Sequence, residues 1–210
     1  MKERPILFSA EMVRALLAGT KTQTRRIVKP QGAILTDDLA RAIKVRPPTS
    51  QNSPVVPCPF GQPGDRLWVR EQHHITLLDA RSVSVRYSNG DVMPEITIGA
   101  REFALYCARK KPKAVTQGRF MWRCLSRLTL EIVSTRVERL HEITEADAKA
   151  EGVTPAPENH TAAAVAYIFG AKEFLAHTSA YASLWEKLNG AGSWALNPWV
   201  WVVEFRRGEA

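Results

Sequence analysis

The stretch LLAGTKTQTRR, Leu16–Arg26, most strongly constrains how this chain folds. An apolar run stops at Gly19, a residue type that readily takes the left-handed conformation that ends a helix. From Lys21 the chain turns polar, and in a strand every second residue would face the same side. These two sets are Lys21, Gln23 and Arg25, and Thr22, Thr24 and Arg26. The stretch therefore predicts a helix end followed at once by a strand that carries threonines and cations.

The chemical meaning of this strand depends on whether Lys21 is buried. If Lys21 is partly desolvated, the neighbouring arginines lower the pKa of its amine and make a neutral amine accessible near pH 7. If Lys21 is solvated, the stretch is an ordinary basic surface strand, and charge and spacing alone favour that simpler interpretation.

Composition predicts a soluble globular protein with one good-sized core. The chain has 210 residues, of which 45% are hydrophobic and 24% charged, as is usual for such proteins. Lys and Arg exceed Asp and Glu by 29 to 21, a formal net charge of +8, which favours an anionic partner such as nucleic acid. No apolar run reaches the roughly 20 residues of a membrane helix, and the N-terminus is too polar for a signal peptide. We expect a cytoplasmic protein without a membrane partner; the sequence leaves its oligomeric state open.

Cysteine and histidine spacing argues against a metal site. The three cysteines, Cys58, Cys107 and Cys124, lie far apart in the sequence, which fits a reducing compartment better than a zinc cluster. His73 and His74 are adjacent, so in a strand they would point to opposite sides and would not share a metal. We therefore expect no metal and no other cofactor.

Local patterns predict an α+β chain in which strands outnumber helices. We expect strands at about 5–8, 22–28, 66–71, 83–87, 92–98, 126–140 and 199–205, and helices at about 10–18, 144–151 and within 162–188. Asn89-Gly90 between two β-rich runs is a strong hairpin signal, and the apolar run from Trp199 to Phe205 predicts a central strand. Residues 30–63 contain seven prolines and are predicted to form a surface insertion that the core does not need.

Glu151 occupies an unusual position at the end of the helix that begins after Thr144. Thr144 and Asp147 have the spacing of a capping box, and Gly152 ends the helix. Glu151 then lies at the negative pole of the helix, where an anion is disfavoured. This placement hints at a function, although a solvated surface glutamate is the simpler alternative.

Three separated pieces together resemble a known family. They are LLAGTKTQTRR at Leu16–Arg26, GDRLWVRE at Gly64–Glu71, and ITEADAKAEGV paired with a terminal NPWVWVVEF. In this order they are similar to the ASCH domain, a relative of the PUA fold, in the form found in phages and prophages. The family's GxKxxxxR element is matched by Gly19, Lys21 and Arg26.

The resemblance implies a PUA-like fold, a mixed and mainly antiparallel β-barrel with helices around its mouth. The chain, residues 1–210, is then a single ASCH domain with insertions at about 30–63, 72–118 and 156–182. Small bacterial members of the family hydrolyse the acyl amide of N4-acetylcytidine. Their lysine, threonine and glutamate are matched here by Lys21, Thr24 and Glu151.

Two classes of function follow from the resemblance. The first is a hydrolase that acts on an acylated pyrimidine nucleoside, in which Thr24 supplies a hydroxyl, and Lys21 and Glu151 handle the proton. A strict strand would place Lys21 and Thr24 on opposite faces, so this chemistry needs a bulge or a twist at the strand entry. The second is a module that binds RNA or single-stranded nucleic acid, with or without ribonuclease activity. The candidates for binding substrate or phosphate are Arg25, Arg26, Glu71 and Arg123.

Overall fold

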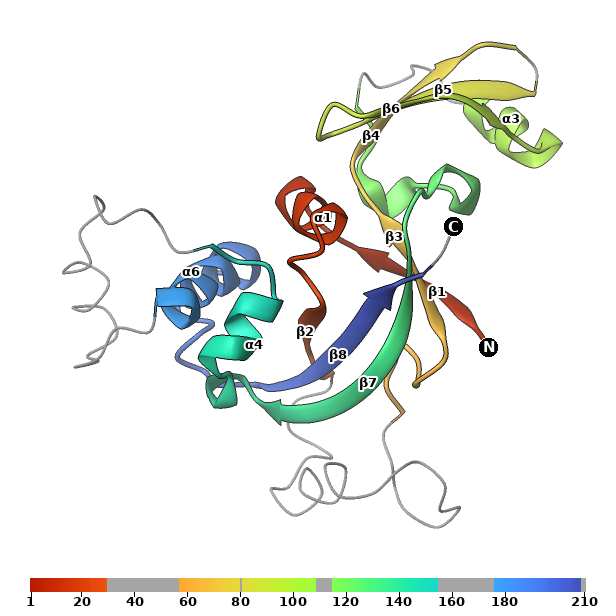
Figure 1. Cartoon of the computed structure of the whole chain (residues 1–210). Helices are drawn as coiled ribbons and strands as arrows, with labels where there is room; N and C mark the ends of the chain where they lie inside the picture. Colours follow the sequence, from red (N-terminus) through yellow and green to blue (C-terminus); the bar gives the residue numbers. More distant parts are fainter. Residues whose placement is uncertain (30–56, 80, 109–114, 155–175, 209–210) are drawn as a thin grey trace.

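The structure is a computed structural model that describes residues 1–29, 57–79, 81–108, 115–154 and 176–208. Within these ranges the protein is α+β, with two sheets in which most neighbouring strands are antiparallel. The predicted fold class is therefore confirmed at this level. Figure 1 shows the larger sheet at the centre, with the smaller sheet beyond one end of it.

The larger sheet has five strands in the order β1-β3-β7-β8-β2. Their bounds are β1 Glu3–Leu7, β3 Arg66–Arg70, β7 Thr129–Arg139, β8 Trp199–Arg207 and β2 Gln23–Ile27. Only β1 and β3 pair in parallel, so the sheet is mixed. β8 lies between β7 and β2 with both faces buried, which confirms that the apolar C-terminal run is an interior strand.

In the described part of the chain, the predicted barrel is not closed. β1 and β2 are the two edges of the five-stranded sheet and do not pair with each other. A side chain connects these edges instead, because Arg26 Nη2 of β2 donates a hydrogen bond of 2.7 Å to the Leu7 carbonyl of β1. Phe8 and Phe205 pack in the core nearby. The edges are thus joined by a guanidinium rather than by a backbone ladder.

A bulge bends the long strand β7. Its pairing with β8 shifts between Ile132 and Ser134, and Val133 is left half exposed. An extra residue of this kind bends a strand and increases its twist. The irregular apolar pattern after Ile132 in the sequence therefore reflects a bulge within one continuous strand.

Short helices cover the edge where β2 lies. α1 (Ala10–Leu17) begins at Ser9, whose hydroxyl accepts a hydrogen bond from Met12 N, and buries Met12, Val13 and Leu16. Gly19 ends this region with φ 74°, as the sequence predicted. α4 (Glu145–Ala150) has the predicted Thr144–Asp147 capping box, and α6 (Ala176–Asn189) packs against α4. The predicted helical segment from 162 lies outside the described residues up to 175.

Residues 72–79, 81–108 and 115–118 form most of a second structural unit. β4 (His73–Leu77), β5 (Ser82–Tyr87) and β6 (Val92–Thr97) make a three-stranded antiparallel sheet, followed by α3 (Ala100–Cys107). The β5–β6 hairpin at Asn89-Gly90 was predicted, whereas β4 and α3 were not. This sheet packs its own apolar cluster, to which Met121 and Leu125 contribute. Three short 3-10 helices, Gly118–Phe120, Arg123–Leu125 and Leu140–Glu142, complete the described elements.

The end of the proline-rich segment contributes to the main core. Cys58 and Phe60 pack against the apolar cluster of the five-stranded sheet. Gly61 fits so closely that a Cβ there would come within 3.0 Å of Ile132 Cδ1. Residues 57–63 therefore pack against the sheet, although the sequence placed them in the insertion; residues 30–56 lie outside the described part. No described helix is long and apolar enough to cross a membrane.

Candidate functional site

Lys21 and Glu151 form a buried ion pair at the open edge of the larger sheet. Lys21 Nζ lies 2.7 Å from Glu151 Oε2, and the two residues are only 2% and 3% exposed. Their backbones also meet in an isolated antiparallel bridge. The sequence paired these residues only through the family resemblance, and the structure brings them together across 130 positions.

The Lys21 ammonium is held at a fixed position by three acceptors. Nζ donates to the Gln23 carbonyl at 2.8 Å, to the Glu151 carbonyl at 2.9 Å and to Glu151 Oε2 at 2.7 Å. Burial lowers the pKa of Lys21 below its usual value, and the positive charges of Arg26 and Arg25 lower it further, although Glu151 opposes both effects. An amine with a lowered pKa is one that proteins use for proton transfer.

Gly152 is required for the close approach of Glu151 to Lys21. Its φ is +77°, and a Cβ at this position would lie 2.8 Å from both Lys21 Cβ and Ala15 Cβ. A glycine that ends α4 in the left-handed region therefore also lets the helix end pack directly on the Lys21 backbone. The sequence predicted the helix end but not this contact.

The chain changes its pairing partner at the start of β2. Lys21 pairs with Glu151, whereas Gln23 and Thr24 already pair with Glu204 and Val203 of β8. Thr24 is buried, and it lines a cavity together with Glu151.

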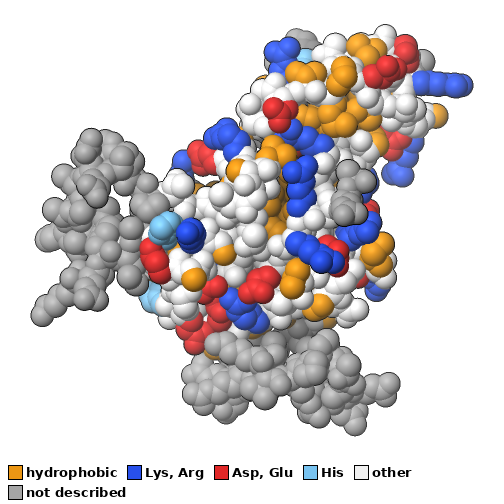
Figure 2. Space-filling view, in the orientation of Figure 1, with side chains coloured by type: hydrophobic (Ala, Val, Ile, Leu, Met, Phe, Trp, Pro, Cys, Tyr) orange, Lys and Arg blue, Asp and Glu red, His pale blue; other side chains and the backbone are white. Residues whose placement is uncertain are grey.

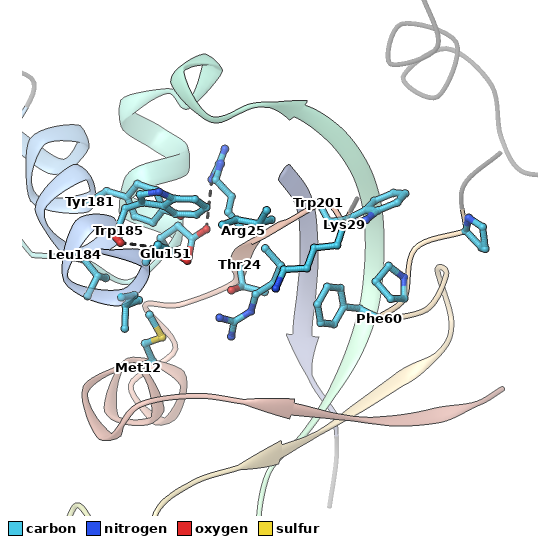
Figure 3. A pocket seen from close by; sticks show the side chains of 16 residues that line it. Met12, Thr24, Arg25, Lys29, Phe60, Glu151, Tyr181, Leu184, Trp185 and Trp201 are labelled. Atoms are coloured by element: carbon cyan, nitrogen blue, oxygen red, sulfur yellow. Dashed lines mark hydrogen bonds and ion pairs between the residues drawn. The ribbon is translucent and has the colours of Figure 1, made fainter. Parts of the chain in front are cut away.

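This cavity has a volume of about 630 Å³ and an aromatic wall (Figure 3). β2 is the last strand of the sheet, so residues from both of its faces reach the cavity along its open edge. α6 supplies Tyr181 and Trp185, and Phe60 and Trp201 lie at the other side. A cavity of this size is typical of sites for small molecules.

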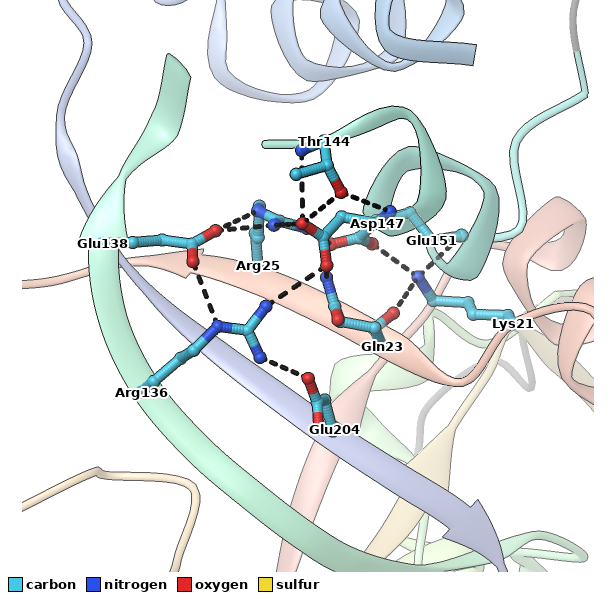
Figure 4. Close-up of polar contacts among 9 residues, drawn as sticks. All are labelled: Lys21, Gln23, Arg25, Arg136, Glu138, Thr144, Asp147, Glu151 and Glu204. Carbon is cyan, nitrogen blue, oxygen red and sulfur yellow. Dashed lines mark hydrogen bonds and ion pairs between the residues drawn. The ribbon is translucent and has the colours of Figure 1, made fainter. Parts of the chain in front are cut away.

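Arg25 is buried behind Glu151 in a network of ion pairs (Figure 4). Its Nη2 lies 2.6 Å from Glu138 Oε1 and 3.4 Å from Asp147 Oδ2, and its Nη1 lies 3.5 Å from Glu151 Oε1. Arg136 extends the network through Glu138, Asp147 and Glu204. Arg25 lines the same cavity as Thr24, but its side chain is fully buried and its guanidinium is paired with carboxylates.

Arg26 lies on the opposite face of β2 and is partly exposed. It lines the cavity of Thr24 and also a neighbouring one of about 460 Å³. Its guanidinium is 5.3 Å from the centre of the Phe8 ring and donates to the Leu7 carbonyl. Burial lowers the pKa of Arg26, although a guanidinium remains charged at neutral pH. Arg26 is therefore the cation best placed to meet an anion beside Thr24.

Glu71 and Arg123 do not join this site. Glu71 is buried and pairs with Arg127 through both oxygens, at 2.9 and 3.0 Å. Arg123 pairs with Glu3 at the surface, at 3.0 Å, and its guanidinium lies 5.9 Å from the Trp68 ring centre. Neither residue lines the cavity of Thr24, so their predicted role in binding the same ligand has no support from their positions.

Sequence reasoning missed several residues around the cavity. Tyr181 and Trp185 were noted only as aromatic positions of a helix, because four-residue spacing usually indicates a core face. Asp147 was identified as a cap, and it also contacts Arg25 and Gln23. Glu138 alternates with apolar residues along β7, so nothing local distinguished it from a solvated strand residue.

No group of three or more His, Cys, Asp and Glu side chains within the described ranges is arranged to hold a metal ion. The arrangement around Lys21 instead combines a buried ion pair with a cavity lined by Glu151, the Thr24 hydroxyl and the partly exposed guanidinium of Arg26. Comparisons with protein-family models, with curated proteins and with solved structures found no match.

Proposed function

We propose that this protein is an amidohydrolase that removes the acyl group from a modified pyrimidine nucleoside such as N4-acetylcytidine. One observation carries the proposal: Glu151, the buried ion-pair partner of Lys21, lines the same cavity as Thr24, and burial lowers the pKa of Lys21. A hydroxyl that shares a cavity with the carboxylate of a buried amine–carboxylate pair is suited to acyl transfer. The proposal includes a PUA-like fold of the ASCH kind, supported by the order of the three matching pieces along the sequence.

In the proposed reaction, Thr24 Oγ1 attacks the acyl carbon, and its proton passes to the Lys21–Glu151 pair. The carbonyl becomes an oxyanion that Arg26 faces from the same side of β2, and a cation there stabilises the transition state. The C–N bond then breaks, and the pair returns the proton to the leaving N4 nitrogen. Water hydrolyses the Thr24 ester and regenerates the hydroxyl.

The walls of the cavity fit a planar ligand. Tyr181 and Trp185 on one side and Phe60 on the other are large rings, and aromatic side chains bind flat heterocycles by stacking. The volume of about 630 Å³ accommodates a nucleoside, within the range usual for such ligands. Size and aromatic character thus both support a nucleobase as the bound group.

The direct test is release of cytidine from N4-acetylcytidine, followed by liquid chromatography and mass spectrometry. Thr24→Val removes the hydroxyl but keeps the shape of the side chain, and it should abolish release. Thr22→Val is the matched control, because Thr22 lies two positions away and is exposed. Failure of the wild-type protein to hydrolyse any acylated nucleoside, or full activity of Thr24→Val, contradicts the proposal.

A second candidate is a nucleic-acid-binding module, favoured by the cations near the cavity. Arg26 and Lys29 line it, and Arg119 lines the neighbouring cavity next to Phe120, which is 56% exposed. Figure 2 shows Lys and Arg side chains around a band of hydrophobic ones between the two sheets. Cations and exposed rings together are typical of single-strand binding. The predicted basic run at 109–113 lies outside the described residues.

A further inference from the structure

Arg25 has no role in the reaction proposed above, yet it pairs with three carboxylates near the site. It is buried, and its guanidinium contacts the carboxylates of Glu138, Asp147 and Glu151. Its short contacts go to Glu138 Oε1, from Nη2 at 2.6 Å and from Nε at 3.2 Å. Glu138 thus anchors the arginine and fixes the direction of its third nitrogen.

That third nitrogen, Nη1, faces Glu151. It lies 3.5 Å from Glu151 Oε1, and among the described residues neither atom has a hydrogen-bond partner. The other oxygen of the same carboxylate, Oε2, accepts the hydrogen bond from Lys21. Glu151 is therefore held between two cations, each on a different oxygen, as Figure 4 shows.

We propose that Arg25, anchored by Glu138, is a positioning residue that directs the Glu151 carboxylate toward Lys21. The proposal rests on the function assigned above, because it concerns the same proton-handling pair. Arg25 lines the cavity, but in this scheme it acts through its contact with Glu151 rather than on the substrate.

The physical reason is that a buried carboxylate held through only one oxygen can turn away from its partner. The guanidinium of Arg25 lies on Glu151 Oε1 and leaves Oε2 directed at Lys21 Nζ. The positive charge of Arg25 also lowers the pKa of Lys21 and so favours the neutral amine that a base requires.

Other charged and titratable groups around the pair also contribute to the electrostatic potential at Lys21. The positive charge of Arg26 on β2 lowers the pKa of Lys21, and Tyr181 of α6 lies beside Arg25, with its ring centre 6.0 Å from the Arg25 guanidinium carbon. The remaining groups on the elements packed around the pair are Glu11 of α1, Arg136 and Glu138 of β7, Asp147 of α4 and Lys187 of α6. Arg25 differs from the other cations of this set in having a direct ion-pair contact with Glu151 Oε1.

Two substitutions test the proposal by the sign of their effects. Arg25→Gln removes a positive charge next to Glu151, so the titration of Lys21 should move to higher pH. Glu138→Gln removes the anion that neutralises Arg25, so the same titration should move to lower pH. Arg136→Gln is the matched control, because Arg136 contacts Glu138, Asp147 and Glu204 and should shift Lys21 least. Titration is followed by the 13Cε signal of Lys21, assigned with Lys21→Arg.

Activity gives the second readout. In Arg25→Gln the acidic limb of the pH–rate profile should move to higher pH. The kcat at pH 7 should fall about 10²-fold, as for a misplaced catalytic group, while KM changes little. Should Arg25→Gln fail to fold, the double variant Arg25→Gln/Glu138→Gln removes both charges of the Arg25–Glu138 ion pair and leaves neither one unpaired. Its Lys21 titration should lie above that of the wild type.

Opposite shifts in the two single variants support the role of Arg25, and shifts in the same direction, or none, overturn it. The carbon signal does not require turnover. A wild-type protein that hydrolyses no acylated nucleoside would thus refute the proposed function while the titration still decides the role of Arg25. Hydrolysis with unchanged pH profiles in both variants would refute the role of Arg25 and leave the function standing.

Discussion

Lys21 Nζ lies 2.7 Å from Glu151 Oε2, and neither side chain is more than 2% exposed. A pair this deeply buried contributes little stability as a whole, but loss of one partner leaves an uncompensated charge in the core. Mutation of either residue is therefore expected to lower the stability of the fold as well as the proposed activity. The first prediction separates these two effects.

Lys21→Arg should eliminate hydrolysis while a charge is retained. A guanidinium does not release its proton near neutral pH, so turnover should fall by about 10²- to 10⁴-fold, the usual contribution of one acid–base group. Lys21→Ala should be equally inactive and also less stable by about 3–5 kcal/mol. Chromatographic activity assays combined with urea unfolding measure both quantities. Lys149→Arg is the control, since Lys149 is exposed on α4 and does not line the cavity, and wild-type turnover by Lys21→Arg would refute the catalytic role.

Gly152→Ala should destabilise the protein more than an alanine at another glycine with the same backbone conformation. Gly192 has φ +79° and no atom within 4 Å of a built Cβ, whereas at Gly152, φ +77°, the Cβ would lie 2.8 Å from Lys21 Cβ. Gly192→Ala should cost about 1–2 kcal/mol from backbone strain alone. Gly152→Ala should add about 1–3 kcal/mol of overpacking. Equal free energies of unfolding for the two variants would show that the contact with Lys21 can relax.

Glu145 should stabilise the start of α6 at neutral pH and lose this effect in acid. Burial alone would raise its pKa, but hydrogen bonds from His177 and Thr178 outweigh it and hold the pKa at about 2, below the usual 4.5. A carboxylate with a depressed pKa stabilises the fold above its unfolded pKa, and the effect disappears as the pH falls from about 4.5 through about 2.

The test of this pH dependence is the stability difference between wild type and Glu145→Gln. It should be about 1 kcal/mol at pH 7, the usual value for a helix cap, and should vanish near pH 2. Thermal unfolding across this range measures it, with the exposed Glu95→Gln as a control that should show little difference at any pH. A difference that does not depend on pH would contradict the ionic origin of the cap.

Single-stranded RNA should bind with an affinity that depends on salt if the cations near the cavity contact phosphates. For Z contacts, the logarithm of affinity should fall by about 0.7Z for each tenfold increase in salt. Arg26→Gln should reduce this slope by about one contact, and Arg14→Gln, on α1 and absent from the cavity linings, should leave it unchanged. Fluorescence anisotropy measures the slope, and binding indifferent to salt would exclude phosphate contacts.

The sequence predicted those parts of the fold that local chemistry determines. Ser9, Gly19 and Thr144 marked helix ends correctly, and Asn89-Gly90 marked the β5–β6 hairpin. β4 was missed because its start, His73-His74, lacks the apolar–polar contrast of a half-buried strand. Local sequence patterns also could not predict whether the barrel closes, because closure depends on whether the two edge strands of the sheet pair with each other.

The candidate site was predicted only in part, for a related reason. Lys21, Thr24 and Glu151 were identified through the resemblance, and their proximity could not be derived from spacing. The contact between Arg25 and Glu138 joins residues 113 positions apart, and each residue viewed alone is an ordinary charged strand residue. Buried charge networks are specified by tertiary packing, so single-sequence periodicity does not reveal them.

The separate apolar cluster of the β4–β6 sheet has a consequence for how the molecule opens. The clusters of the larger sheet contain the residues around Lys21, whereas Val83, Val85 and Tyr87 pack in a cluster of their own. Regions with separate cores tend to unfold as separate cooperative units. Amide protons of β5 should therefore exchange with solvent in events that leave those of β8 protected, so the protein can lose its smaller sheet transiently while the Lys21 cavity persists.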